Sequence, residues 1–188
     1  MDSKVSNQTI FTELVKPITE GFLEGINDTI IMYGPTGSGK TYTMLGDERI
    51  RKNLNEITEH ELFLNNKPGI LLYALDYIFK HIQYNMFLNV SYIEVYNDNA
   101  YDLLQEKIEL TVSEQESGKF VLKGVKEHIV KSVNEVIEVI RKGEKNRHYA
   151  ENVMNRNSSR SHTIFQVKLT KVNGEKSFKS EMVIIYIN

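Results

Sequence analysis

A glycine-rich stretch at residues 34–41 carries residue types that bind phosphate. It fits the pattern G-x-x-x-x-G-K-[ST]. The glycines let the backbone curl so that several N–H groups point at phosphate oxygens. Lys40 should reach the β- and γ-phosphates, and the Thr41 hydroxyl should ligate Mg²⁺. A plain glycine-rich turn is the alternative. The residues predicted to contact a nucleotide here are Gly34, Pro35, Thr36, Gly37, Ser38, Gly39, Lys40 and Thr41.

A second polar run, residues 155–162, contains the hydroxyls of Ser158 and Ser159 beside Arg160. A solvated loop is the usual interpretation of such a run. With a phosphate loop in the same chain, these side chains could instead close over a γ-phosphate and its Mg²⁺ when triphosphate is bound.

The phosphate loop needs a strand before it and a helix after it. The apolar run at residues 29–33 predicts a buried parallel strand, and residues 42–45 can open a helix. Helical spacing covers residues 8–24, where Pro17 should kink or split the helix and Gly25 offers a stop.

The remaining pattern alternates strands and helices. A helix is expected at 69–84 and a strand at 87–96, followed by short strands within 108–130 that turn at residues 117–118. The capping box at 132–135 predicts a helix that leaves at Gly143. Apolar and polar residues alternate at 163–172, which predicts a strand. A hairpin turn is expected at 173–174, and a last apolar strand at 182–187. Residues 46–67 suggest a long surface loop. We therefore predict an α/β sandwich around the phosphate loop.

Composition indicates one soluble domain of 188 residues. The net charge of −2 predicts neither a nucleic-acid nor a membrane partner, although residues 101–188 are weakly basic, with 15 Lys/Arg against 12 Asp/Glu. No cysteine is present, which excludes disulfides and cysteine-ligated zinc. No stretch is apolar enough to span a bilayer, so the cytosol is the expected location.

Several spaced motifs together resemble a kinesin motor domain. They are the residues 33–44, which read Y-G-P-T-G-S-G-K-T-Y-T-M, and the residues 155–162, which read N-R-N-S-S-R-S-H. Two further motifs resemble the family. One combines residues 91–97 with 102–104, and the other is residues 25–30; all of the motifs follow the order of the family. Residues 143–151 are similar to the centromere-associated subgroup.

The resemblance implies an α/β fold of the P-loop NTPase type, a kinesin-motor-like central β-sheet flanked by helices. It implies ATP and Mg²⁺ as ligands and microtubules (tubulin) as partner. Residues 155–162 match switch I, in which Ser159 approaches Mg²⁺, Ser158 neighbours the γ-phosphate, and Arg160 pairs with a switch II glutamate. Asn155 opens this run and is counted with it as catalytic. Tyr42 matches a side chain placed against adenine.

Two surface segments also match the family. Residues 46–67 match an insertion beside the nucleotide. The hairpin around 106–131, with Lys119, Lys123 and Lys126, matches a secondary microtubule contact. The implied reaction is phosphoryl transfer to water, catalysed by positioning and charge neutralisation.

The chain also departs from the family pattern. It starts after the family's first strand, and Asn188 stands where the family has the Asp of switch II. We therefore expect a partial motor domain over residues 1–188, incomplete at both ends, without switch II and the main microtubule-binding helices. Losing that carboxylate should weaken the Mg²⁺ site, and the missing helices should weaken microtubule binding. Pro35, where Gln is common, removes one loop N–H.

Two hypotheses follow. The first is an ATP-binding microtubule motor domain fragment in the cytoplasm and cytoskeleton, whose own ATP hydrolysis is left open. The second is a non-catalytic nucleotide-binding or interaction module derived from a kinesin. A small-molecule kinase fits less well, because residues 158–162 have no place in it. Dimerisation would need a coiled-coil stalk elsewhere.

Overall fold

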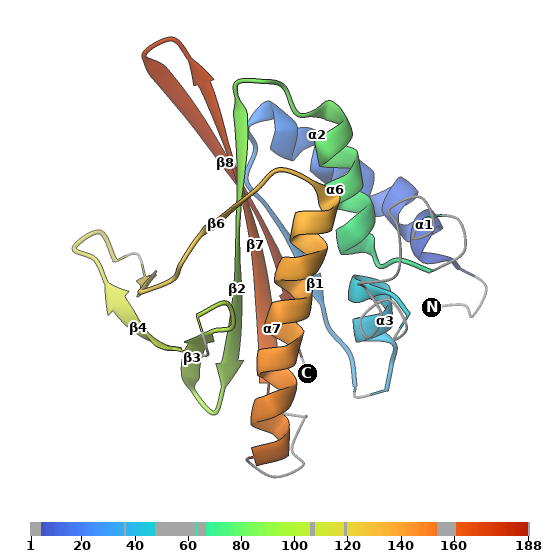
Figure 1. Ribbon diagram of the computed structural model, residues 1–188, viewed down its shortest axis with the longest axis vertical. Helices are drawn as coiled ribbons and strands as arrows, with labels where there is room; N and C mark the ends of the chain where they lie inside the picture. The colour runs from blue at the N-terminus through green and yellow to red at the C-terminus, as the bar shows by residue number, and fades with distance from the viewer. Residues whose placement is uncertain are drawn as a thin grey trace.

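A mixed sheet with helices packed on it forms the frame of the molecule (Figure 1). The computed structural model describes residues 5–35, 37–47, 63, 67–105, 108–118, 120–153 and 161–187. Within these residues the sheet has eight strands in the order β1-β8-β7-β2-β3-β4-β5, and β6 also pairs with β2. The strands are β1 (Asp28–Met32), β2 (Met86–Tyr96), β3 (Asn99–Asp102), β4 (Ile108–Glu114), β5 (Phe120–Lys123), β6 (His128–Val130), β7 (Ser161–Asn173) and β8 (Lys176–Tyr186).

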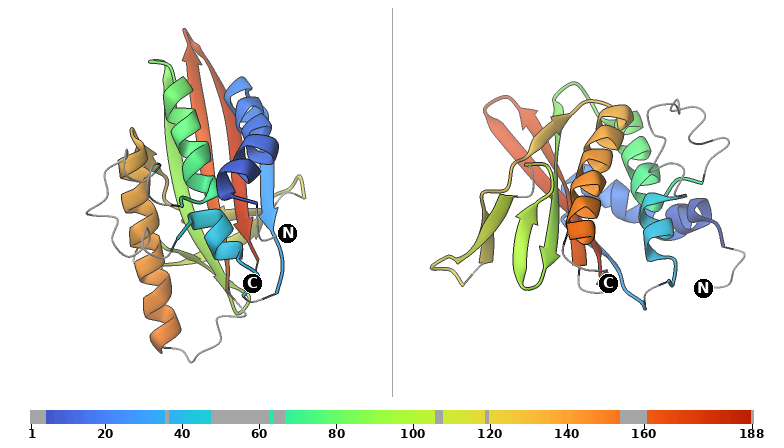
Figure 2. Two further views of the ribbon diagram at one scale, coloured as in Figure 1. Left: turned by 90° about the vertical axis from the view of Figure 1, so that its right-hand side faces the viewer. Right: turned by 60° about the horizontal axis from the view of Figure 1, so that its bottom comes forward.

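The described helices are α1 (Asn7–Ile10), the π-helical turn η1 (Phe11–Val15), α2 (Lys16–Glu24), α3 (Lys40–Leu45), α6 (Ile70–His81) and α7 (Val133–Val153). Figure 2 shows α6 and α7 side by side on the sheet. Their buried apolar side chains meet Leu88, Phe165 and Ile184 in the main core. A smaller cluster around Ile93 and Leu110 lies on the other face of the sheet. The predicted α/β architecture is confirmed.

The strand before the phosphate loop is parallel to β8, as predicted, but it is not buried. β1 is the end strand of the described sheet, and Ile31 is 57% exposed. Ile31 ends a cross-strand row that runs through Ile185 and Ile164 to the fully buried Ile93. The small second cluster covers only the Ile93 end of this row. An apolar run therefore indicated a strand here but not its burial.

The predicted interruption at Pro17 is confirmed. The chain passes from α1 through the π-helical turn η1 into α2, with Pro17 in the first turn of α2, where its missing N–H costs little. The helix ends at Gly25, whose φ of +104° lies in the left-handed region. The helix expected at 69–84 is α6.

The capping box before α7 is present, in a slightly shifted form. The Glu135 N–H donates to Ser132 Oγ over 3.2 Å, while the Glu135 carboxylate accepts from the Lys131 N–H over 2.9 Å. The predicted exit at Gly143 is wrong, because α7 continues to Val153. A Cβ on Gly143 would lie 2.2 Å from the Tyr92 ring. This glycine therefore allows the helix to approach β2, and does not end it.

The C-terminal half follows the expected hairpins. The turn at residues 173–174 joins β7 to β8, with Gly174 at φ +60°. β8 begins at Lys176, earlier than the predicted residue 182, because its pairing with β7 extends to the turn. The short strands within 108–130 are β4, β5 and β6, and Gly118 makes the expected turn at φ +75°. Most of the loop predicted at 46–67 lies outside the described residues.

Candidate nucleotide-binding site

The glycine-rich loop lies between β1 and α3, as the motif requires (Figure 1). Gly37 and Gly39 have φ values of +82° and +91°, which side chains other than glycine rarely adopt. No atom lies within 4 Å of a Cβ built on either glycine, so the requirement is conformational and not steric. Gly39 caps α3, whose first turn closes with the Thr43 N–H donating to the Gly39 carbonyl over 2.8 Å. Thr36 lies outside the described residues.

Lys40 bends back into this loop. Its ammonium donates to the carbonyl oxygens of Gly34 (2.7 Å) and Pro35 (3.0 Å), and the residue is only 8% exposed. A buried ammonium needs such acceptors, since burying it without them is costly. Pro35, which offers no N–H, thus contributes its carbonyl oxygen, which also accepts from the Ser38 N–H over 3.1 Å. The backbone of the loop therefore surrounds the Lys40 ammonium and supplies its hydrogen-bond acceptors.

Thr41 points to the end of β8. Its Oγ1 lies 2.6 Å from the Tyr186 hydroxyl. The Tyr186 ring has Lys40 Nζ 5.6 Å from its centroid and Arg147 Cζ of α7 5.3 Å from it. No sequence motif indicated Tyr186 or Arg147 as site residues. The only signal was a single hydroxyl-bearing ring among the isoleucines of the last strand.

The residues predicted for the second polar run, Asn155, Ser158, Ser159 and Arg160, lie outside the described residues. Both described flanks of this run approach the loop. β7 begins at Ser161, and its Thr163 is paired with Tyr186. Ser161 is buried and its hydroxyl donates to Glu94 over 2.6 Å.

The other flank is α7, which a buried polar network holds against the sheet. The Tyr92 hydroxyl donates to Glu144 over 2.5 Å, and Arg147 lies 3.6 Å from the same carboxylate. Burial raises the pKa of Tyr92 well above its usual value, and the Glu144 charge raises it further. Because Arg147 also contacts the Tyr186 ring, this network joins α7 to the glycine-rich loop.

The two ends of the predicted insertion, residues 46–67, are held together beside α3. Buried Asn7 donates to the carbonyl oxygens of Tyr42 (3.0 Å) and Pro68 (3.1 Å). Gly46 and Pro68 form an isolated bridge, and a Cβ on Gly69 would lie 2.0 Å from the Met44 carbonyl oxygen. Tyr42 itself is 41% exposed. No sequence pattern pointed to Asn7.

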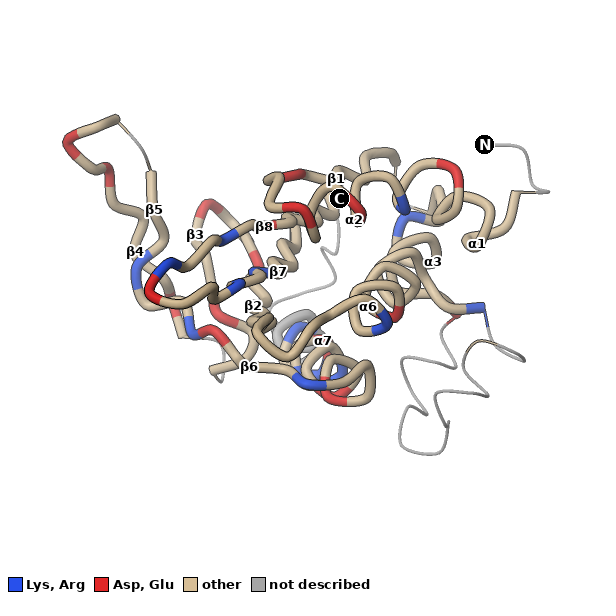
Figure 3. Tube along the Cα trace, turned by 90° about the horizontal axis from the view of Figure 1, so that it is seen from above, with Lys and Arg blue, Asp and Glu red and all other residues tan. Residues whose placement is uncertain are grey.

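The predicted microtubule-contact lysines are partly described. Lys123 and Lys126 are exposed at the β4–β5 lobe, and Lys119 lies outside the described residues. The Lys126 N–H donates to Asp102 over 2.9 Å, which fixes the backbone there. Figure 3 shows basic and acidic positions interspersed around this lobe.

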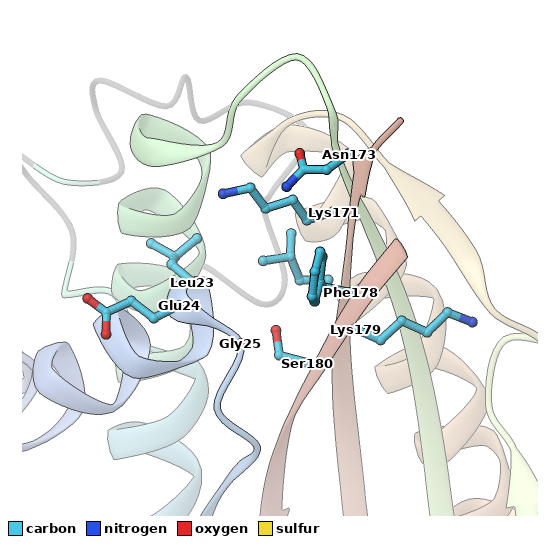
Figure 4. Close-up of a pocket in the computed structure, with 9 residues that line it drawn as sticks. Leu23, Glu24, Gly25, Lys171, Asn173, Phe178, Lys179 and Ser180 are labelled. Carbon is cyan, nitrogen blue, oxygen red and sulfur yellow. The ribbon is translucent and has the colours of Figure 1, made fainter. Parts of the chain in front are cut away.

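A separate pocket of about 400 Å³ lies at the far end of β8 (Figure 4). The end of α2 and the β7–β8 hairpin line it, and Lys171 and Lys179 point to opposite sides of the hairpin. None of the residues predicted to bind nucleotide lines this pocket.

Two searches of the described part of the chain found nothing. It holds no group of three or more His, Asp or Glu side chains placed to bind a metal. None of its helices has the length and apolar character needed to cross a membrane. The Thr41 hydroxyl at the glycine-rich loop is an oxygen donor of the kind that Mg²⁺ accepts.

Comparison with known proteins gives a consistent result. The kinesin motor domain family model matches residues 1–186. The chain is 36% identical to kinesin-like protein kif7 of Danio rerio over 90% of its length and 12% of that protein. It is 37% identical to the kinesin heavy chain of Drosophila melanogaster, in a match that covers 93% of this chain and 17% of that protein. Identity to human centromere-associated protein E is 34%, over 92% and 6%, which does not favour that subgroup.

Among solved structures, a fast kinesin matches with a TM-score of 0.82 and 31% identity. The match covers 97% of this chain and 50% of that one. The chain thus spans about half of the solved motor, and about a fifth or less of each relative named above.

Proposed function

Because this chain belongs to the kinesin motor domain family, we propose that residues 34–42 and 155–160 form its binding site for ATP and Mg²⁺. The observation that supports this most is the position of Lys40. Its ammonium lies inside a loop of the phosphate-binding type, against two carbonyl oxygens of that loop. An anionic phosphate would offer this cation a stronger, charge-assisted bond than the carbonyls do.

Three side chains at the C-terminal end of the loop have specific roles in this proposal. Lys40 would turn to the β- and γ-phosphates, and the Thr41 hydroxyl would ligate Mg²⁺. The exposed Tyr42 side chain would lie against the adenine. Mg²⁺, when bound, supplies charge neutralisation for phosphoryl transfer to water.

The second run would complete the site. Ser158 would contact the γ-phosphate and Ser159 would approach the Mg²⁺. Arg160 would have the family role of pairing with a switch II glutamate, and Asn155 would open the run. The support is positional: Thr163 at the start of β7 pairs with Tyr186, which contacts Thr41.

Titration with a fluorescent ATP analogue tests the site. Replacing Lys40→Met should weaken binding about 10- to 100-fold, because it removes a hydrogen bond to a charged group. Lys80→Met is the matched control, since Lys80 is an exposed lysine paired with Asp76 at 2.7 Å on α6. Equal affinity of the wild type and Lys40→Met would place the nucleotide elsewhere.

We further propose that residues 1–188 act as a partial kinesin motor domain on cytoplasmic microtubules, with its own ATP hydrolysis left open. The solved neighbour is described with an ATPase mechanism and interactions with microtubules. The exposed Lys123 and Lys126 would meet the acidic tubulin surface, together with Lys119. ATP turnover measured with and without microtubules tests this. Nucleotide binding without any turnover would support a non-catalytic module instead.

A further inference from the structure

A buried tyrosine outside the glycine-rich loop contacts both of the loop side chains that carry the proposed function. Tyr186 is 7% exposed, and its hydroxyl lies 2.6 Å from Thr41 Oγ1. Two cations lie near its ring, with Lys40 Nζ 5.6 Å and Arg147 Cζ 5.3 Å from the ring centroid. The motif assigns nothing to this residue, which is 145 positions away from Thr41 in the chain.

The chemistry of the two hydroxyls sets the direction of the effect. A threonine hydroxyl has one proton and two acceptor lone pairs. If a lone pair of Thr41 binds Mg²⁺, its proton must be donated to another acceptor. The Tyr186 oxygen is already within hydrogen-bond distance, and a phenol can accept while its own proton turns away. When Thr41 donates its proton to Tyr186, its own lone pairs are left for the metal.

We propose that Tyr186 is a positioning residue for Mg²⁺ binding: its hydroxyl fixes the rotamer of Thr41 and accepts the Thr41 proton. This inference rests on the proposed function. It adds a specific role for the strand that ends beside the loop. The ring would act separately, as an aromatic face for the Lys40 and Arg147 cations.

The substitution Tyr186→Phe isolates the hydroxyl, because it keeps the aromatic ring beside Lys40 and Arg147. The measurement is the Mg²⁺ concentration that gives half-maximal binding of a fluorescent ATP analogue, alongside the affinity for the analogue in EDTA. We expect the Mg²⁺ requirement to rise about tenfold, as is usual when a hydrogen-bond partner of a metal ligand is lost. The affinity in EDTA should stay at the wild-type value, which a general loss of structure would not allow.

Two further variants sharpen the test. Tyr77→Phe removes a hydroxyl that donates to Glu20 over 2.8 Å on the exposed surface, and should leave the Mg²⁺ requirement unchanged. Thr41→Val removes the metal ligand itself, so adding Tyr186→Phe to it should change nothing more.

The outcomes separate the two proposals. A wild-type Mg²⁺ requirement in Tyr186→Phe, or a lower one, would overturn this inference and leave nucleotide binding intact. An additional effect of Tyr186→Phe in the Thr41→Val background would also overturn it, because Tyr186 would then act by another route. If the wild-type protein bound no nucleotide at all, the proposed function would fail as well.

Discussion

The two ends of the β7–β8 hairpin carry polar groups in different ways. In Figure 1 the glycine-rich loop, the end of β8 and the last turns of α7 lie at the lower end, and the β7–β8 turn lies at the top. At the lower end, buried or partly buried hydroxyls bond to other side chains, Thr41 to Tyr186 and Ser161 to Glu94.

Towards the upper end, charged side chains on the surface form ion pairs, and the buried Ser180 hydroxyl donates to the Phe22 carbonyl oxygen over 2.7 Å. Lys168 lies 2.7 Å from Glu127 and 3.8 Å from Glu181, and all three side chains are nearly 40% exposed. Such pairs contribute little to stability, whereas a buried polar group is costly unless its partners are in place. We infer that the connected polar groups at the lower end depend on one another's positions, while the exposed ion pairs towards the upper end tolerate change.

The largest expected effect is that of Gly143→Ala. The new Cβ would lie 2.2 Å from the Tyr92 ring, which is buried and stacked edge-on against Phe165 at 5.3 Å. Because neither the helix nor the ring can yield easily, we expect a loss of about 3 kcal/mol or more in the free energy of unfolding. Urea denaturation measures it.

The control for this change is Gly21→Ala, in the helix α2. Its Cβ would meet Ile26 at 3.4 Å, an ordinary contact. An alanine should therefore stabilise the helix by about 0.5–1 kcal/mol. If both variants had the same unfolding midpoint, the close approach of α7 to β2 would be contradicted.

Tyr92→Phe should have the next largest effect. It removes the hydroxyl that donates to the buried carboxylate of Glu144 over 2.5 Å. We expect a loss of about 1–3 kcal/mol, since the carboxylate keeps its burial but loses a donor. Because Glu144 also contacts Arg147, hydrogen exchange in α7 should accelerate as well. A stability loss with unchanged exchange in α7 would break the proposed link between this network and the helix.

Lys168→Met, at the exposed end, should cost only about 0–1 kcal/mol. In the wild type, the hydrogen bond that Lys168 donates to Glu127 lowers the pKa of the Glu127 carboxyl below its ordinary value of 4.5. A lowered carboxyl pKa stabilises the fold above the unfolded-state pKa, and that contribution disappears as pH falls through the folded-state pKa. The stability difference between wild type and Lys168→Met should therefore be present at pH 7 and vanish in acid. A difference that grew as the pH fell would contradict the ion pair.

Sequence patterns found what depends on neighbouring residues in the chain. The strand, the glycine-rich loop and the positions of Lys40 and Thr41 follow from a local motif, and the hairpin turns follow from Gly118 and Gly174. The same local rules failed at Gly143, where a contact with a ring on β2 overrides the usual role of glycine at a helix end.

Contacts between distant segments were beyond these patterns. Tyr186 meets Thr41 across 145 positions, and Asn7 reaches Pro68 across 61. Nothing in the spacing of either residue indicates its partner. The exposure of β1 was missed for a related reason, since burial depends on which elements cover a strand and not on its own composition.

The central claim is that residues 34–41 and 155–160 bind one nucleotide together. Hydrogen exchange followed by mass spectrometry, with and without a non-hydrolysable ATP analogue and Mg²⁺, tests it most directly. We expect both segments to gain protection together, while the β7–β8 turn at residues 173–175 does not change. Protection of only one segment, or protection that Lys40→Met leaves intact, would contradict the claim.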